Sequence, residues 1–299
     1  MNSLLFTGAS GFIGQNLVLE LQNSFSIKTI GLSDIDYYKT NLATSVPDLK
    51  DVFNIVIHAA GKAHSVPKTE AEGKVFFDVN LQGTKNLCMA LEKTGLPKSF
   101  IFVSTVAVYG LEAGENIKEE IPLNGNTPYA LSKIQAEQFL TEWCNKHNVI
   151  LTILRPSLIA GPNPPGNLGA MIKGISTGKY LSIGGGKARK SVLMVQDIAN
   201  LIPLVADKGG VYNVCDSHHP SFGELEELIC KQLNKSSVIS VPFFIAKLLA
   251  IVGDLLGKYA PINSDKLSKI TKSLTFSNEK ARSTLGWEPL NVLDNFRIK

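Results

Sequence analysis

The chain has 299 residues, of which 44% are hydrophobic, and a formal net charge of +4 at pH 7. This length allows one large α/β domain with an appended lobe, and the hydrophobic content suits an ordinary buried core and excludes a disordered chain. The charge is spread without a run of lysine or arginine, which argues against nucleic-acid binding, and its mild excess suits an anionic substrate.

The first predicted elements are a strand over residues 4–7, a tight turn, and a helix. Gly8, Gly11 and Gly14 stand at three-residue spacing in this turn. Gly8 would permit the turn, Gly11 would let a pyrophosphate approach the backbone, and Gly14 would let the helix pack on the strand. Such a triad is weak evidence when it stands alone, since tight turns also use glycine, but its place after the first strand favours a dinucleotide site.

A second strand is predicted over residues 27–32. The interval that follows is short for a helix and another strand, so we expect residues 37–40 to form the third strand directly. An acidic residue after the second strand binds the ribose hydroxyls of NAD in many dinucleotide sites. Asp34 stands near that place and no arginine is close, which favours NAD, while Ser33 leaves NADP open.

Further apolar runs lie over residues 55–59, 100–104 and 150–155 and alternate with helical patterns. They predict an α/β fold of Rossmann type, with a doubly wound parallel sheet. After Pro156 the connections become rich in glycine and proline. We therefore predict an NAD(P)-binding domain over residues 1–157 and a smaller α/β substrate lobe over residues 158–299, interleaved at the boundary.

Tyr129 and Lys133 stand one helical turn apart at the start of a predicted helix, so their side chains project from one side. A phenol is a poor base at neutral pH, but a neighbouring ammonium and a positively charged nicotinamide ring both favour the phenolate. We interpret Tyr129 as the acid–base group, and Lys133 as the group that tunes it and donates to the nicotinamide ribose. Such pairs are frequent by chance, so their context decides.

An apolar stretch over residues 243–256 invites comparison with a membrane span. Lys247 and Asp254 interrupt it, and it is shorter than the ~20 residues that a spanning helix needs. We predict a core-facing or lid helix, with contact to a membrane surface as the weaker alternative.

A buried strand over residues 100–104 ends in two hydroxyl side chains, at the sheet edge where open α/β sheets bind ligands. With this strand, several motifs occur in one order along nearly the whole chain. On them the chain resembles an extended short-chain dehydrogenase/reductase, in the nucleotide-sugar branch of the NAD-dependent epimerase/dehydratase family. The motifs are the glycine triad, His58-Ala59-Ala60-Gly61, Asn80 to Thr84, Ser104-Thr105, Tyr129 to Lys133 and Arg155-Pro156.

The resemblance makes Thr105 the hydroxyl that binds the reacting sugar oxygen, with Ser104 lining the same pocket. Dehydratases of the family carry Asp and Glu at the next two positions, where this chain has Val106 and Ala107. These side chains cannot exchange protons, so dehydration is disfavoured. The resemblance also makes Asn80 a group that positions the active-site loop.

For the substrate diphosphate, the resemblance implies contacts from Asn167 and Leu168. The family then expects an arginine where this chain has Lys190, with Arg189 beside it, and either side chain can bind phosphate. The cofactor contacts that it implies come from Gly8, Ser10, Gly11, Phe12, Ile13, Gly14, Ser33, Asp34, Asn41, Leu42, Ala59, Ala60, Gly61, Asn80, Val103, Tyr129, Lys133 and Pro156.

The leading interpretation is a UDP-hexose 4-epimerase that uses NAD and passes through a transient 4-keto sugar. The alternatives are an NADPH-dependent reductase of 4-keto-6-deoxy nucleotide sugars and a non-catalytic dinucleotide-binding regulatory protein. A nucleotide sugar, with UDP favoured, is the expected partner, and the dimer packing of the family leaves a homodimer open.

The four cysteines, at positions 88, 144, 215 and 230, show no paired spacing, and the histidines have no metal-ligand spacing. No secretory signal is expected before the first strand, so we predict a reducing, cytoplasmic location without a metal, a nucleic acid or a membrane as partner.

Overall fold

The computed structural model describes residues 2–256 and 263–298 of the chain. A central sheet of seven parallel strands runs through it in the order β11-β7-β5-β4-β1-β2-β3, which confirms the predicted doubly wound α/β sheet. Its strands are β1 (Asn2–Thr7), β2 (Phe25–Gly31), β3 (Tyr38–Lys39), β4 (Ile55–His58), β5 (Ser99–Val103), β7 (Ile150–Pro156) and β11 (Gly210–Val214).

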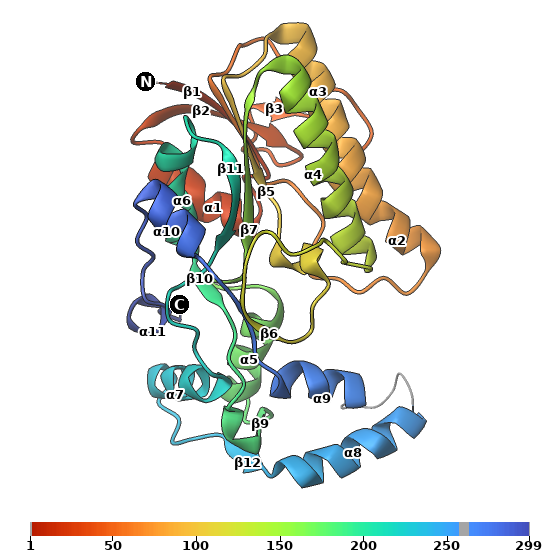
Figure 1. The fold of residues 1–299 in the computed structure, drawn as a ribbon, viewed down its shortest axis with the longest axis vertical. Helices are drawn as coiled ribbons and strands as arrows, with labels where there is room; N and C mark the ends of the chain where they lie inside the picture. The colour runs from red at the N-terminus through yellow and green to blue at the C-terminus, as the bar shows by residue number, and fades with distance from the viewer. Residues whose placement is uncertain (1, 257–262, 299) are drawn as a thin grey trace.

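Alternating side chains of the strands feed two separate cores, one on each face of the sheet. Leu4 and Phe6 pack with α1 (Phe12–Leu21), α6 (Val195–Val205) and α10 (Glu279–Leu285). Leu5, between them in the sequence, packs with α3 (Gly83–Thr94) and α4 (Pro128–His147) on the other face. Figure 1 shows these two helical layers on either side of the sheet. This period of two is what a strand buried on both faces requires.

The chain passes from β2 to β3 without a helix, and Ile30 pairs with Tyr38 in parallel register. The expected third strand is therefore confirmed, over two residues. From β3 the chain returns to the other side of β1, where β4 pairs with it. The strand order thus reverses between β1 and β4, and the carboxyl ends of these strands form the crevice in which such sheets bind ligands.

The lower part of Figure 1 is built from short parallel pairs and helices. The pairs join β8 (Leu158–Ala160) to β10 (Val192–Met194), β9 (Leu181–Ile183) to β12 (Ile239–Val241), and β6 (Gly114–Ile117) to β13 (Leu274–Phe276). The helices are α5 (Gly166–Ser176), α7 (Phe222–Gln232), α8 (Phe243–Leu256), α9 (Ser264–Thr271) and α11 (Val292–Asn295).

The division at residue 157 stays a prediction. Three elements that follow it in the chain, α6, β11 and α10, belong to the layers of the central sheet, while β6 pairs across with β13. The polypeptide crosses between the two regions several times.

Helix α8 packs on the protein only through a narrow face of small residues, which corrects the core-facing alternative, and the lid alternative stays a prediction. Its buried positions are the small residues Ala246, Ala250 and Gly253, while Leu248 is 63% exposed and Leu255 is 86% exposed. Within residues 2–256 and 263–298, no helix combines the length and the apolar character that crossing a membrane requires.

Candidate active site

The glycine turn between β1 and α1 has the close backbone contacts that its sequence predicts. Gly8 has a φ of +82°, and a Cβ there would lie 2.7 Å from the backbone nitrogen of Ala60. A Cβ on Gly14 would lie 2.2 Å from the carbonyl oxygen of Gly8, so α1 can pack this closely only through glycine. Gly11 precedes the helix without a side-chain cap, so the first N–H groups of α1 are available to an anion.

The acidic group at the end of β2 is Asp36 and not Asp34. Asp34 forms an ion pair with Lys39 and its side chain is 94% exposed. Asp36 is buried and folds back on β2, where its Oδ2 accepts from the backbone N–H of Ser33 at 2.9 Å. Its Oδ1 is buried without a hydrogen-bond partner. Sequence spacing does not reveal Asp36, because the reversal of the chain after β2 brings it back onto the strand.

Asn41 and Leu42, both expected to contact the cofactor, differ in burial. The side chain of Leu42 is buried in the core beneath α3, and its carbonyl accepts from the Asn86 side chain at 2.7 Å. Asn41 is exposed and its Oδ1 accepts from the N–H of Ala43 at 3.1 Å, which closes a local turn. Only Asn41 presents a side chain at the surface here.

His58 is a buried structural residue that links the two strands at the crevice. Its Nδ1 lies 2.6 Å from the Thr7 hydroxyl and its Nε2 lies 2.9 Å from the Thr84 hydroxyl. Burial lowers the pKa of His58 to about 3, with Lys133 adding to the effect. Because Thr84 donates to the carbonyl of Asn80, its oxygen accepts from Nε2–H, and the ring stays neutral.

Asn80 holds the loop after β4 against α4. It lies in a π-helical turn (Asp78–Gln82) between α2 (Glu70–Phe77) and α3, and it is buried. Its Oδ1 accepts from the N–H of Lys62 at 2.7 Å, and its Nδ2 donates to the hydroxyl of Ser132 at 2.9 Å. A Cβ on Gly61 would lie 3.1 Å from Asn80 Oδ1 and 3.3 Å from the Nζ of Lys133, so this loop passes directly beside the lysine.

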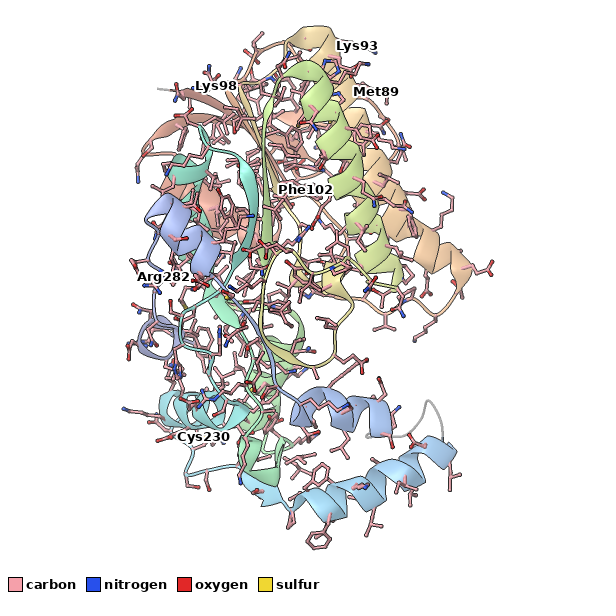
Figure 2. All side chains as sticks on the ribbon, viewed as in Figure 1. Met89, Lys93, Lys98, Phe102, Cys230 and Arg282 are labelled. Atoms are coloured by element: carbon pink, nitrogen blue, oxygen red, sulfur yellow. The ribbon has the colours of Figure 1, made fainter. Side chains whose placement is uncertain are left out.

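Three side chains meet at the carboxyl end of β5: Thr105, Tyr129 and Lys133. Helix α4 starts after Thr127, whose side chain accepts from the N–H of Ala130, and this start places Tyr129 in the first turn. Tyr129 is half-buried and is hydrogen-bonded to Thr105. Lys133 is buried one turn later and donates to the carbonyl of Val103 at 2.9 Å. Its Nζ also lies 4.6 Å from the centroid of the Phe102 ring, which is labelled in Figure 2.

The electrostatics of this trio differ from the expectation. Burial raises the pKa of Tyr129, and the hydrogen bond with Thr105 acts in the opposite direction. Burial lowers the pKa of Lys133 to about 8, against the attraction of Glu137. The group that favours the phenolate in this arrangement is therefore Thr105, because the lysine ammonium is bonded to Val103.

Ser104 does not present its hydroxyl to the crevice. It is buried and donates to Oε1 of Glu137, a partner 33 residues away. Glu137 also forms a buried ion pair with Arg155, at 2.6 Å, and Arg155 in turn donates to the hydroxyl of Tyr109 at 3.0 Å. The Arg155-Pro156 motif therefore anchors α4 to β7, and the expectation that Ser104 lines the substrate pocket is corrected.

The four residues expected to contact the substrate diphosphate differ in how far they are buried and in their partners. Leu168 is fully in the C-terminal core, so its side chain cannot contact a ligand, whereas Asn167 is exposed at the start of α5. Arg189 donates to the carbonyl of His219 at 2.7 Å and lies 3.5 Å from Glu224. Lys190 is half-buried and donates to the carbonyl of Lys272 at 3.0 Å, and burial lowers its pKa.

The remaining predicted cofactor residues lie at or just after the carboxyl ends of strands of the central sheet. Ser10, Phe12 and Ile13 lie in the glycine turn and the first turn of α1, while Ala59 follows β4 and Pro156 ends β7.

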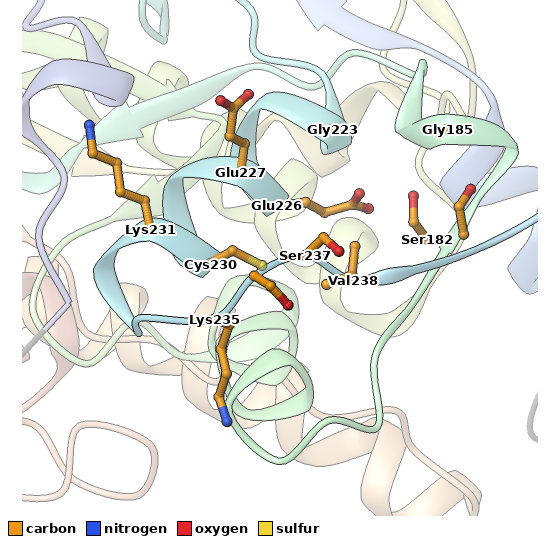
Figure 3. Close-up of a pocket in the computed structure, with 12 residues that line it drawn as sticks. Ser182, Gly185, Gly223, Glu226, Glu227, Cys230, Lys231, Lys235, Ser237 and Val238 are labelled. Carbon is orange, nitrogen blue, oxygen red and sulfur yellow. The ribbon is translucent and has the colours of Figure 1, made fainter.

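A separate pocket of about 490 Å³ lies between α7 and the segment before β12 (Figure 3). Glu226, Lys231 and Lys235 line it, and none of the predicted site residues does. In the described ranges, no group of three or more His, Cys, Asp or Glu side chains could hold a metal ion.

Comparisons with known proteins agree with this geometry. A family model described as the NAD dependent epimerase/dehydratase family matches residues 4–215. An N-acetyl-α-D-glucosaminyl-diphospho-ditrans,octacis-undecaprenol 4-epimerase of Escherichia coli O157:H7 is 32% identical, over 95% of this chain and 89% of its own. A UDP-glucose 4-epimerase of Vibrio cholerae is 29% identical, over 97% of this chain and 92% of its own.

A third relative, the GDP-6-deoxy-D-mannose reductase of Pseudomonas aeruginosa, is 30% identical over 76% of this chain and 78% of its own. Among solved structures, RMD from Pseudomonas aeruginosa complexed with NADPH has a TM-score of 0.75 at 23% identity, covering 98% of this chain and 95% of its own. The UDP-glucose 4-epimerase of Thermotoga maritima with UDP-glucose also has a TM-score of 0.75, at 20% identity and the same coverage. These two likenesses establish a shared fold.

Proposed function

This chain belongs to the NAD-dependent epimerase/dehydratase family, and we propose that it is an NAD-dependent 4-epimerase of diphosphate-linked sugars, with a UDP-hexose as the first candidate substrate. The observation that carries the proposal is the hydrogen bond between Thr105 and Tyr129 at the end of β5, with Lys133 one helical turn later and beside Gly61. A redox cofactor and an acid–base pair at one sheet edge are what epimerisation through a keto sugar needs.

The residues present fit a dinucleotide. The uncapped start of α1 and the glycine turn would hold the pyrophosphate, and the unpartnered Oδ1 of Asp36 would accept from a ribose hydroxyl. A carboxylate there would repel the extra phosphate of NADP, which supports NAD. Bound NAD would supply reversible acceptance of a hydride from C4 of the sugar.

The side chains of this chain would handle the proton. As the phenolate, Tyr129 would take the proton of the C4 hydroxyl, and as the resulting phenol it would give the proton back, while Thr105 would hold the same oxygen in place. Lys133 would leave the carbonyl of Val103 to bind the ribose hydroxyls and, as an ammonium, stabilise the phenolate. Dehydration of the sugar would not be catalysed at this site, since neither Val106 nor Ala107 carries an acidic or basic group.

For the diphosphate we assign Lys190 and the start of α5. The Arg189 guanidinium is already engaged with Glu224 and a carbonyl, whereas Lys190 has a neutral carbonyl as its partner. Pro165 gives α5 no side-chain cap, so its first N–H groups can face an anion.

Two other functions have specific support. The relative from Escherichia coli O157:H7 favours N-acetylglucosamine linked through a diphosphate to a polyprenol as a second candidate substrate for the same reaction. The Pseudomonas reductase favours reduction of a 4-keto-6-deoxy nucleotide sugar. All three reactions would use the same trio of side chains.

The test is to purify the protein without added cofactor and to identify any bound dinucleotide by mass spectrometry. The protein is then given UDP-glucose, UDP-galactose, their N-acetyl forms, and N-acetylglucosaminyl-diphospho-polyprenol. Retained NAD with interconversion of one pair supports the epimerase and names its substrate. Oxidation of NADPH with a 4-keto-6-deoxy nucleotide sugar, and no interconversion, would establish the reductase, whereas dinucleotide binding without any turnover would favour a regulatory protein.

A further inference from the structure

Helix α8 presents its large apolar side chains to the outside and its small ones to the protein. Phe244, Leu248 and Leu255 are 65%, 63% and 86% exposed, and they follow one another at spacings of four and seven residues on one helical face. Ile251 and Val252 widen the same face and are also exposed. Figure 2 shows side chains of α8 pointing away from the rest of the chain.

The small side chains on the inward face of α8 are buried against neighbouring elements. Ala246 and Ala250 pack with Leu267 of α9, and Ile183 and Val241 border this small cluster. Asp254 accepts from the N–H of Ser264 at 3.0 Å and from its hydroxyl, which fixes α8 to the start of α9. Among residues 2–256 and 263–298, nothing covers the outer face, whose large apolar side chains are unusual for a surface helix.

The charge is not spread evenly along the chain, which corrects that expectation, because the segment from the end of α7 to the end of α9 is basic. Residues 231–272 contain seven lysines and two aspartates, so their net charge is +5, whereas the whole chain has +4 and the rest sums to −1. Lys235, Lys247 and Lys272 of this segment are exposed. In Figure 1, α7, α8 and α9 lie together at one end of the molecule.

We propose that the outer face of α8 docks on an anionic lipid membrane, with its apolar side chains in the interface and the surrounding lysines on the headgroups. An apolar helix face bordered by basic residues is the arrangement that lies in a membrane surface without crossing it. A second copy of this chain fits the same face less well, because a symmetric contact would place two segments of charge +5 against each other. This proposal departs from the expectation that the chain has no membrane partner.

Docking goes beyond the proposed epimerisation and needs none of its residues. If the second candidate substrate is the true one, the same surface would bring the enzyme to its lipid-linked sugar, and that consequence alone rests on the proposed function.

The experiment is sedimentation of the full chain with vesicles of phosphatidylcholine alone and with vesicles that contain about one third phosphatidylglycerol. The variant Leu248→Ser/Leu255→Ser removes two side chains of the outer face. Its matched control, Leu19→Ser/Val52→Ser, removes two exposed apolar side chains, of 65% and 60% exposure, from the part of the chain that builds the central sheet.

We expect the unmodified protein and the control to bind the anionic vesicles, more weakly at high salt, and the α8 variant to bind at least about tenfold more weakly. Binding that the α8 variant retains, or no binding by any form, would overturn the proposal. A third outcome would also overturn the proposal: light scattering shows a dimer, the α8 substitutions dissociate it, and the protein does not bind vesicles. Interconversion of soluble UDP-sugars, measured in parallel, reports on the proposed function separately, because neither variant touches the site.

Discussion

The Nζ of Lys133 donates to the backbone carbonyl of Val103 at 2.9 Å, at the point where β5 ends and the hydroxyl residues of the site begin. This bond keeps a buried ammonium beside the crevice without an acidic partner in direct contact. Burial lowers the pKa of Lys133 to about 8, against the attraction of Glu137, which places its titration within the range where enzymes are studied.

The affinity for NAD should therefore depend on pH through Lys133. A lysine with a pKa of about 8 is an ammonium below that pH and loses its charge above it, so its bond to the ribose weakens as pH rises through 8. We expect Lys133→Met to bind NAD about tenfold more weakly at pH 7 and to lose this dependence. Calorimetric titration from slightly acidic to alkaline pH measures both; a variant that keeps the alkaline loss of affinity would assign it to another group.

Tyr129→Phe should lower kcat by about 10²–10⁴-fold and leave NAD affinity within about threefold, because it removes the proton carrier and little volume.

Thr105→Val should shift the optimum of kcat to higher pH, because the hydrogen bond from Thr105 holds the Tyr129 pKa down. Thr105→Ser keeps the hydroxyl and serves as its control. Steady-state kinetics across pH decide the matter, and full turnover by Tyr129→Phe would remove Tyr129 from the acid–base role.

Asp36→Asn should weaken NAD binding by about tenfold and reduce the preference for NAD over NADP, since it removes the charged acceptor at the end of β2. Asp34→Asn, two positions earlier, is the matched control and should change the affinity by less than about twofold, because that side chain is exposed and paired only with Lys39. The dissociation constants of both dinucleotides are the measurement. A larger loss of NAD affinity in Asp34→Asn than in Asp36→Asn would support the original expectation that Asp34 binds the ribose.

Gly14→Ala should destabilise the protein by about 1–3 kcal/mol, although alanine is the better helix former, because its Cβ would lie 2.2 Å from the Gly8 carbonyl. Gly11→Ala meets the same oxygen at 3.3 Å and should unfold nearly as the unmodified protein does. It should instead lose NAD affinity, since the methyl group would stand where the pyrophosphate approaches. Urea unfolding and NAD titration separate the two effects, and equal stability losses would contradict this division.

Lys190→Gln should raise KM for the sugar substrate by about tenfold with little change in kcat, because it removes a charge that binds the diphosphate in ground state and transition state alike. Arg189→Gln is expected to have the smaller effect, since its guanidinium is engaged with Glu224 and the His219 carbonyl. Steady-state kinetics of the two variants on one substrate compare them. The reverse order would assign the diphosphate to Arg189.

Much of the architecture could be predicted from local patterns. Apolar runs at the right lengths indicated the strands, and the short interval after β2 indicated the direct passage to β3. The glycine spacing predicted a close turn, and the contacts around Gly8 and Gly14 have that form. Each of these features depends on residues that are neighbours in the sequence, so backbone geometry and side-chain size suffice to specify them.

Other features depended on partners that only folding brings together. Ser104 reads as a pocket hydroxyl until Glu137, 33 residues away, takes its hydrogen bond. Asp34 and Asp36 carry the same side chain two positions apart, and only the turn after β2 determines that Asp36 is the buried one.

The parallel sheet, the glycine turn and the Tyr129–Lys133 spacing follow from the sequence alone, because periodicity and chain stereochemistry act over a few residues. Which carboxylate, hydroxyl and cation remain available to a ligand depends on the folded chain, and so does the outward direction of the large apolar side chains of α8. Burial and hydrogen-bond partnership are properties of the space between distant segments, and an apolar helix pattern does not say what covers it.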